Sequence, residues 1–179
     1  MKPALIAALI ILLLTTACVR LVSTAQPMSG RNPFTPAADA RLCAAADLQT
    51  SSSAHEDVGV VILGVTLINA SKRPCSLQNP PQVTLFDAAQ PLDVQVTQAE
   101  SLQTPPAPAV LTIAPGESVI LILTWRNHCG AAPKTGPAVN LALPGGETLN
   151  IQAGAPVVPR CEAANAPSTL TVNPYSYPP

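Results

Sequence analysis

Short runs of alternating hydrophobic and polar residues follow one another along most of the chain, and turn-forming residues separate them. Alternation with a period of two places every second side chain on one face of a β-strand. The 21 prolines exclude long helices after the N-terminal segment. The predicted strands are Ala45–Thr50, Val58–Asn69, Gln82–Phe86, Leu92–Thr97, Val110–Ile113, Val119–Trp125, Val139–Leu143, Thr148–Ile151 and Leu170–Val172.

About nine short strands without intervening helices predict an all-β fold, an immunoglobulin-like antiparallel β-sandwich of about 7–9 strands. Gly145 and Gly146 indicate the turn of one hairpin. The wide Cys, Trp and Cys spacing of antibody domains is missing, because Trp125 stands just before Cys129. We therefore expect the architecture of an immunoglobulin sandwich without membership of the antibody family.

Two of the predicted strands are hydrophobic on both faces. Trp125 and the alternate residues before it form one face, which we expect in the core. The opposite faces carry the residues of a predicted apolar interaction patch: Val60, Ile62, Ile120 and Ile122. Burial of one isoleucine is worth about 1.5–3 kcal/mol, so such a patch predicts a cover. The cover is either the chain's own proline-rich loop or C-terminal tail, or a partner protein.

The N-terminus has the features of a bacterial lipoprotein signal peptide. A charged residue, Lys2, precedes an apolar run and small residues that end at Cys18. We expect residues 1–17 to be removed and the Cys18 thiol to carry a diacylglyceryl group, whose two chains suffice for stable anchoring. A transmembrane anchor is an alternative, although the apolar run is short for a span of about 20 residues. A signal that ends elsewhere and removes Cys18 is another.

This interpretation gives the domain organisation. Residues 18–40 are a lipid-attached flexible linker without hydrophobic period, residues 41–174 the β-sandwich domain, and residues 175–179 a Pro/Tyr tail. The expected location is the extracytoplasmic face of the bacterial cell envelope, with the lipid as the attachment to the membrane. The four remaining cysteines are an even number, as expected for disulfides in an exported domain.

Three pairings of these cysteines are possible. We favour Cys43–Cys75 and Cys129–Cys161, because each bridge brackets one half of the domain. A zinc or copper thiolate site is the alternative, but its usual short ligand spacing is missing, so we expect no metal and no cofactor.

Charged residues make up 11% of the chain and the formal net charge is −1. This composition offers no basic patch, so we expect no nucleic-acid partner. Only 5 aromatic residues argue against a face that stacks on sugars or single strands. No G-x-S-x-G or H-E-x-x-H string is present, and we expect no enzyme.

Individual polar residues have structural interpretations. His55, Glu56 and Asp57 are expected in a solvated loop, because neighbours in an extended segment point in alternate directions. His128 forms a thiol dyad with Cys129 only if that cysteine is free. Asn69 is expected to serve a turn.

Several strings carry a resemblance: L-I-N-A-S-K-R-P-C-S-L, P-P-Q-V-T-L-F-D, I-A-P-G-E-S-V, L-T-W-R-N-H-C and L-T-V-N-P. Between Cys43 and Pro174 the chain resembles an uncharacterised bacterial domain, domain of unknown function 4232. The resemblance implies a β-sandwich domain in an exported protein, either secreted or a lipoprotein, and it implies no activity or site residues. Because catalytic motifs are missing and two strands are apolar on both faces, we expect a non-enzymatic envelope lipoprotein that presents an interaction or scaffold domain to an envelope protein. The alternative is an extracytoplasmic solute- or metal-binding module.

Overall fold

The computed structural model describes residues 40–99, 107–154 and 157–179. The predicted signal peptide, Cys18 and nearly all of the predicted linker lie outside these residues. The described parts contain 12 strands and one short 3-10 helix. In chain order they are β1 (Arg41–Leu42), the 3-10 helix η2 (Ala45–Asp47), β2 (Leu48–Asp57), β3 (Val60–Asn69), β4 (Cys75–Gln78), β5 (Gln82–Asp87), β6 (Gln90–Pro91), β7 (Gln95–Gln98), β8 (Val110–Ile113), β9 (Ser118–Arg126), β10 (Ala138–Ala142), β11 (Thr148–Gln152) and β12 (Thr169–Val172).

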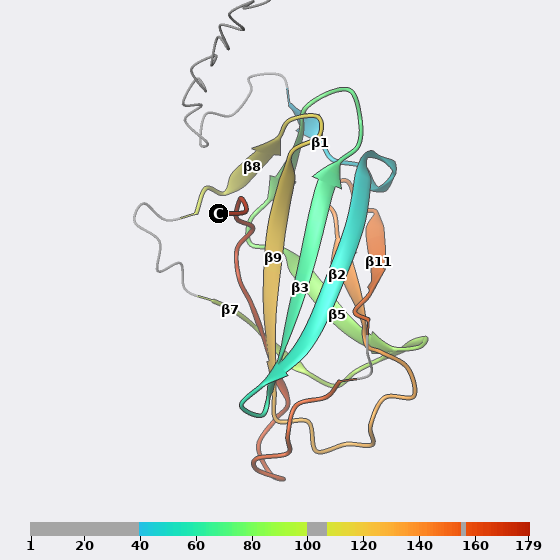
Figure 1. Cartoon of the computed structure of the whole chain (residues 1–179), viewed down its shortest axis with the longest axis vertical. Helices are drawn as coiled ribbons and strands as arrows, with labels where there is room; N and C mark the ends of the chain where they lie inside the picture. The colour runs from blue at the N-terminus through green and yellow to red at the C-terminus, as the bar shows by residue number, and fades with distance from the viewer. Residues whose placement is uncertain (1–39, 100–106, 155–156) are drawn as a thin grey trace, which may run out of the picture. The chain divides into compact units, whose positions relative to one another are not determined.

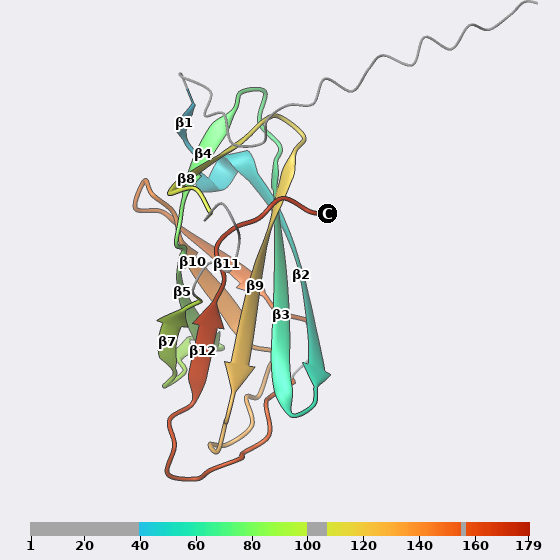
Figure 2. The same cartoon turned by 90° about the vertical axis from the view of Figure 1, so that its left-hand side faces the viewer.

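The domain is a sandwich of two layers. One layer is a five-stranded sheet with the order β2-β3-β9-β12-β7. The other contains the four-stranded sheet β11-β10-β5-β6 and the three-stranded sheet β1-β4-β8. Figure 2 shows β2, β3 and β9 on one side and β4, β5, β10 and β11 on the other. The predicted all-β sandwich with two disulfides is confirmed.

The strand count and two of the pairings differ from the pattern expected from sequence. Pro80 and Pro81, which have no N–H to donate, lie between β4 and β5, and the chain bends at residues 79 and 80. Strands β1 and β6 have two residues each, too few for a period to be recognised. Two strand pairs are parallel, β1 with β4 and β7 with β12. The remaining pairs are antiparallel, as expected.

The core lies between the layers and is built on β3 and β9. Alternate residues of these strands are fully buried, including Leu63, Leu121 and Trp125. The Trp125 indole N–H donates a hydrogen bond to the Ser168 hydroxyl at 2.8 Å. The polar edge of the ring is thus satisfied while its apolar surface packs in the core. The expected core position of Trp125 is confirmed.

A buried asparagine closes the turn after β3. The side-chain amide of Asn69 donates hydrogen bonds to the carbonyls of Arg73 (2.8 Å) and Ile113 (2.9 Å). Its oxygen accepts from the N–H and the hydroxyl of Ser71 at 3.0 and 2.7 Å. One neutral side chain therefore provides hydrogen bonds to the turn after β3 and to the last carbonyl of β8. These bonds confirm the turn role expected for Asn69.

Two further buried asparagines fasten other loops. The Asn127 side chain donates to the Ala163 carbonyl at 3.0 Å and accepts the Ala163 N–H, also at 3.0 Å. The Asn79 side chain donates to the Pro108 carbonyl at 3.0 Å and accepts the Tyr175 N–H at 2.9 Å. Each of these side chains provides hydrogen-bond partners for backbone N–H and C=O groups of an irregular segment, which has no neighbouring strand to provide them.

The C-terminal residues are part of the domain. Tyr175 is 3% exposed and belongs to the core, and burial raises the pKa of its hydroxyl. Ser176 and Ile120 exchange two backbone hydrogen bonds of 2.8 and 3.0 Å. The Tyr177 hydroxyl donates to the Thr112 carbonyl at 2.6 Å. Residues 175–177 therefore extend the fold past Pro174, where we expected it to end, because an aromatic ring gains from burial.

Both favoured disulfides are confirmed, and they lie in different surroundings. Cys43 and Cys75 are bonded and are 1% and 0% exposed. Cys129 and Cys161 are bonded and exposed. Both bridges span a sequence separation of 32 residues, so loop closure alone predicts a similar stabilisation of about 3–4 kcal/mol for each.

We expect the two bridges to differ in access to a reductant. In the folded full chain, a small thiol should reduce Cys129–Cys161 at least about tenfold faster than Cys43–Cys75, which needs local opening first. Alkylation followed by peptide mass spectrometry measures the two rates. In denaturant, the control condition, the rates should converge. Equal rates in the folded state would contradict the prediction.

Candidate functional site

The outer face of the five-stranded sheet carries the apolar residues that the core does not use. We call Ile62 and Ile68 of β3 together with Ile120 and Ile122 of β9 the isoleucine face. All four side chains are partly exposed. Figure 1 shows β9, β3 and β2 in front, side by side. Because side chains alternate along each strand, the fully buried residues of β3 and β9 force these isoleucines to the outside.

The register spaces the isoleucines apart. Ile62 lies opposite Thr124, and Ile122 lies opposite Gly64. A Cβ on Gly64 would be 3.9 Å from Cδ1 of Ile122 and 2.9 Å from the Ser53 hydroxyl oxygen. The missing side chain at Gly64 thus leaves room that its neighbours fill. The result is a surface of isoleucine and threonine side chains, which the polar outer residues of β2 border.

Val60 does not belong to the exposed part of the predicted patch. It is 8% exposed, at the first position of β3. The Arg160 N–H donates to the carbonyl of the preceding Gly59 at 3.0 Å, and the Arg160 side chain packs on that glycine. A segment distant in sequence therefore packs at this end of the strand, and the exposed residues of the patch are Ile62, Ile120 and Ile122.

The C-terminal tail lies beside this face. Two backbone hydrogen bonds between Ser176 and Ile120 form an isolated antiparallel bridge to β9, and Tyr175 packs in the core. Of the proline-rich loop, residues 104–106 lie outside the described part of the chain, and the carbonyl of Pro108 is bonded to Asn79. The isoleucines keep part of their surface exposed beside these segments.

The polar triplet of the sequence lies in a strand. His55, Glu56 and Asp57 form the end of β2 and are exposed, so the expected loop is wrong, although the exposure was expected. Pairing of β2 with β3 continues to Asp57, and His55 lies opposite Ile62. Among residues 40–99, 107–154 and 157–179, no three His, Cys, Asp or Glu side chains come together in a geometry that could hold a metal ion.

His128 has a structural environment. Its neighbour Cys129 is bonded to Cys161 and therefore has no thiol to activate. The His128 ring lies 5.1 Å from the Trp125 ring, and its Nε2 is 2.9 Å from the Ala131 carbonyl oxygen. The thiol-dyad hypothesis is excluded by the disulfide.

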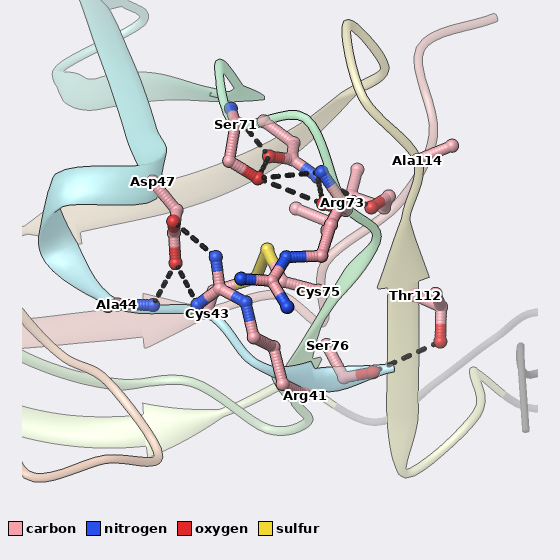
Figure 3. The surroundings of a disulfide bond; sticks show 12 residues. Arg41, Cys43, Ala44, Asp47, Ser71, Arg73, Cys75, Ser76, Thr112 and Ala114 are labelled. Atoms are coloured by element: carbon pink, nitrogen blue, oxygen red, sulfur yellow. Dashed lines mark hydrogen bonds and ion pairs between the residues drawn. A yellow bond between two sulfur atoms is a disulfide. The ribbon is translucent and has the colours of Figure 1, made fainter. Parts of the chain in front are cut away.

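A buried carboxylate that the sequence did not reveal stands beside the Cys43–Cys75 bridge (Figure 3). Asp47 accepts two hydrogen bonds from the Arg41 guanidinium, at 2.5 and 2.6 Å, and one from the Ala44 N–H at 2.8 Å. These interactions, that with Arg41 first, lower the pKa of Asp47 below its ordinary value of 3.8. Residues Ala45–Asp47 form the 3-10 helix η2, so the strand expected from Ala45 begins only at Leu48.

The lowered pKa of Asp47 predicts how stability depends on pH. The contribution of the carboxylate is complete above pH 3.8 and is lost as the pH falls through its lower value in the folded state. Denaturant unfolding between pH 7 and pH 2 should show a steeper acid loss for wild type than for Asp47→Asn, which should be less stable at pH 7. Replacing the exposed Asp93 by asparagine is the control, and equal pH profiles for wild type and Asp47→Asn would contradict the prediction.

A cleft of about 510 Å³ opens where β4 passes into β5. Its lining includes the amides of Gln78, Gln82 and Gln98, the ring of Pro80, and Tyr175. Among the lining residues that the structure describes, none is charged. The amide side chains of the described lining can therefore offer hydrogen bonds to a neutral polar molecule.

The described residues thus define an all-β, disulfide-linked sandwich domain. The family model described as "Domain of unknown function (DUF4232)" matches residues 43–176, and the chain belongs to this family. The resemblance seen in the sequence is confirmed. No curated protein and no solved structure matches the chain.

The compartment follows from the covalent structure. Two disulfides indicate an oxidising, extracytoplasmic environment for the domain. Within the described part of the chain, no helix combines the length and the hydrophobicity needed to cross a bilayer.

Proposed function

We propose that this protein is a non-enzymatic lipoprotein of the bacterial envelope. A diacylglyceryl group on Cys18 attaches it to the membrane, and the sandwich domain binds or scaffolds another envelope protein. The isoleucine face carries the proposal. Its residues are apolar and partly exposed on the outside of a sheet whose other face already forms the core. A set of this kind favours a contact that removes it from water.

The surroundings of the face support a protein partner. Thr66 and Thr124 lie among the isoleucines, and Ser51 and Ser53 of β2 border them. Their hydroxyls supply hydrogen bonds at the rim of an apolar centre, which is the usual composition of a protein interface. Among the described residues, no charged side chain lies between these isoleucines, so a partner needs no matching charge there.

The cleft beside Tyr175 favours a second candidate, a module that binds a neutral solute. Isothermal calorimetry with copper, zinc and small neutral solutes on the full chain separates this candidate from the first. Stoichiometric binding of a solute that Gln82→Ala abolishes would favour the cleft. Stoichiometric binding of either metal would favour the metal-binding form of the alternative.

The anchor is tested at Cys18. The wild-type chain should incorporate labelled palmitate and stay in the membrane fraction, and Cys18→Ser should lose the label because it removes the acyl acceptor. A membrane-bound wild type without label would indicate a transmembrane anchor instead. A soluble, unlabelled wild type would indicate a signal that ends elsewhere.

The isoleucine face is tested by two charges. Ile120→Glu with Ile122→Glu in the full chain should abolish capture of a partner from detergent-solubilised membranes, because two carboxylates would have to be buried at the contact. Circular dichroism and thermal unfolding must show that the variant is folded. Val110→Glu is the matched control, since Val110 is exposed on β8, away from this face.

A captured protein is accepted as the partner only if it captures this chain in the reciprocal experiment and if the Val110→Glu variant still binds it. A folded Ile120→Glu, Ile122→Glu variant that still captures the same partner would overturn the proposed role of the face. Unfolding of the variant alone would show that the face is covered within the chain.

A further inference from the structure

Strand β2 forms an open edge of the five-stranded sheet. It pairs with β3 over ten residues, Leu48–Asp57, and no other strand of the described residues pairs with it. Figure 1 shows β2 at the side of the sheet, next to β3. A sheet edge carries a row of backbone N–H and C=O groups that can pair with another strand.

The hydrogen bonds show which residues present these groups. The Ala70 N–H donates to the Asp47 carbonyl at 2.8 Å, just before the register continues with Leu48 opposite Asn69. In an antiparallel pair, hydrogen-bonded and non-hydrogen-bonded positions alternate. Gln49 and every second residue after it therefore bond to β3. The residues whose backbone groups face the free edge are Leu48, Thr50, Ser52, Ala54 and Glu56.

This edge lacks the features that usually prevent pairing. The segment L-Q-T-S-S-S-A-H-E-D contains no proline and no lysine, and its register with β3 runs without a bulge. The side chains from Thr50 to Ala54 are small and uncharged. Another strand can therefore approach the edge to the normal spacing of about 4.8 Å.

The neighbouring layer leaves an apolar side chain at the same corner. The Ser52 hydroxyl donates to the Gln152 carbonyl of β11, the edge strand of the second layer. Leu149 of β11 packs against the core, but part of its side chain remains exposed.

We propose that β2 pairs antiparallel with β2 of a second copy of this chain. The pairing joins two five-stranded sheets into one continuous sheet. An identical strand supplies the same spacing of backbone N–H and C=O groups, so the two edges can satisfy each other, and where serine lies opposite serine the hydroxyls can both donate and accept. Parallel pairing is disfavoured, because it would set Glu56 and Asp57 beside their own copies.

The same charges disfavour one neighbouring register. With Ser53 opposite Ser53 of the partner subunit, Glu56 lies opposite Thr50 of the partner subunit and Asp57 opposite Gln49 of the partner subunit. A shift that centres the pair on Ser52 would set Asp57 opposite Asp47 of the partner subunit. The register centred on Ser53 therefore avoids contacts between like charges. This pairing does not involve the isoleucine face. It places the isoleucine faces of the two copies on one continuous sheet.

Sedimentation equilibrium of the oxidised full chain in density-matched detergent tests the pairing. The wild-type mass should rise with concentration from one chain to two. Ala54→Pro should remain a single chain, because it removes an edge-facing N–H, and proline is compatible with an edge strand at such a position. Ala54→Val keeps the N–H and should dimerise, as should the Ile120→Glu, Ile122→Glu variant.

Cysteine cross-linking tests the register. Cα atoms of a non-hydrogen-bonded pair are about 4.5 Å apart, within disulfide range, so Ser53→Cys should give a covalent dimer. Ser51→Cys lies on the same face of β2 and is the matched control, because its two copies would stand far apart.

These measurements can overturn the proposal. A wild type that stays a single chain at all concentrations, or Ala54→Pro that dimerises like wild type, would exclude pairing through this edge. Loss of the dimer in Ala54→Val would point to side-chain contacts, and loss in the Ile120→Glu, Ile122→Glu variant would point to the isoleucine face. Equal cross-linking through Ser51→Cys and Ser53→Cys would exclude the register.

Discussion

The antiparallel ladder between β3 and β9 is the interaction on which the rest of the domain depends. Eight consecutive residue pairs join Val61–Ile68 to Ser118–Trp125. Both strands contribute fully buried side chains to the core, so the ladder and the hydrophobic contact are formed by the same residues. Strand β2 attaches to one side of this pair, and β12 with the C-terminal residues attaches to the other.

The same ladder produces both the isoleucine face and the open edge of β2. Its residue alternation sends one set of side chains into the core and leaves the isoleucine face outside. Its hydrogen-bond alternation decides which backbone groups of β2 are left unpaired at the edge. The isoleucine face and the open edge of β2 therefore both depend on the register of β3, since a change in that register would move both of them.

Local patterns in the sequence were sufficient for the elements that β3 and β9 define. The period-two run ending at Trp125 predicted its strand and its buried face, and Asn69 predicted a turn. The cysteine pairing was favoured from spacing and is confirmed. The family resemblance, over nearly the same residues, is confirmed as well.

Contacts between distant segments were not predictable in this way. The polar string from Ser51 to Asp57 has a low strand propensity, and it becomes a strand because β3 offers it a complete ladder. Val60 is buried at an end of β3 where a segment a hundred residues later packs. Tyr175 enters the core although prolines surround it in the sequence, and the Asp47 carboxylate depends on a partner, Arg41, outside any periodic pattern.

The three buried asparagines have a consequence for the conditions that the domain tolerates. Asn69, Asn79 and Asn127 hold loops together with neutral amide groups, which neither titrate nor attract counterions. Dissolved ions screen attractions between charges but leave amide hydrogen bonds largely unaffected. The loop connections of this domain should therefore hold equally well in dilute and in concentrated salt, so that the ionic strength outside the cell has little influence on its shape.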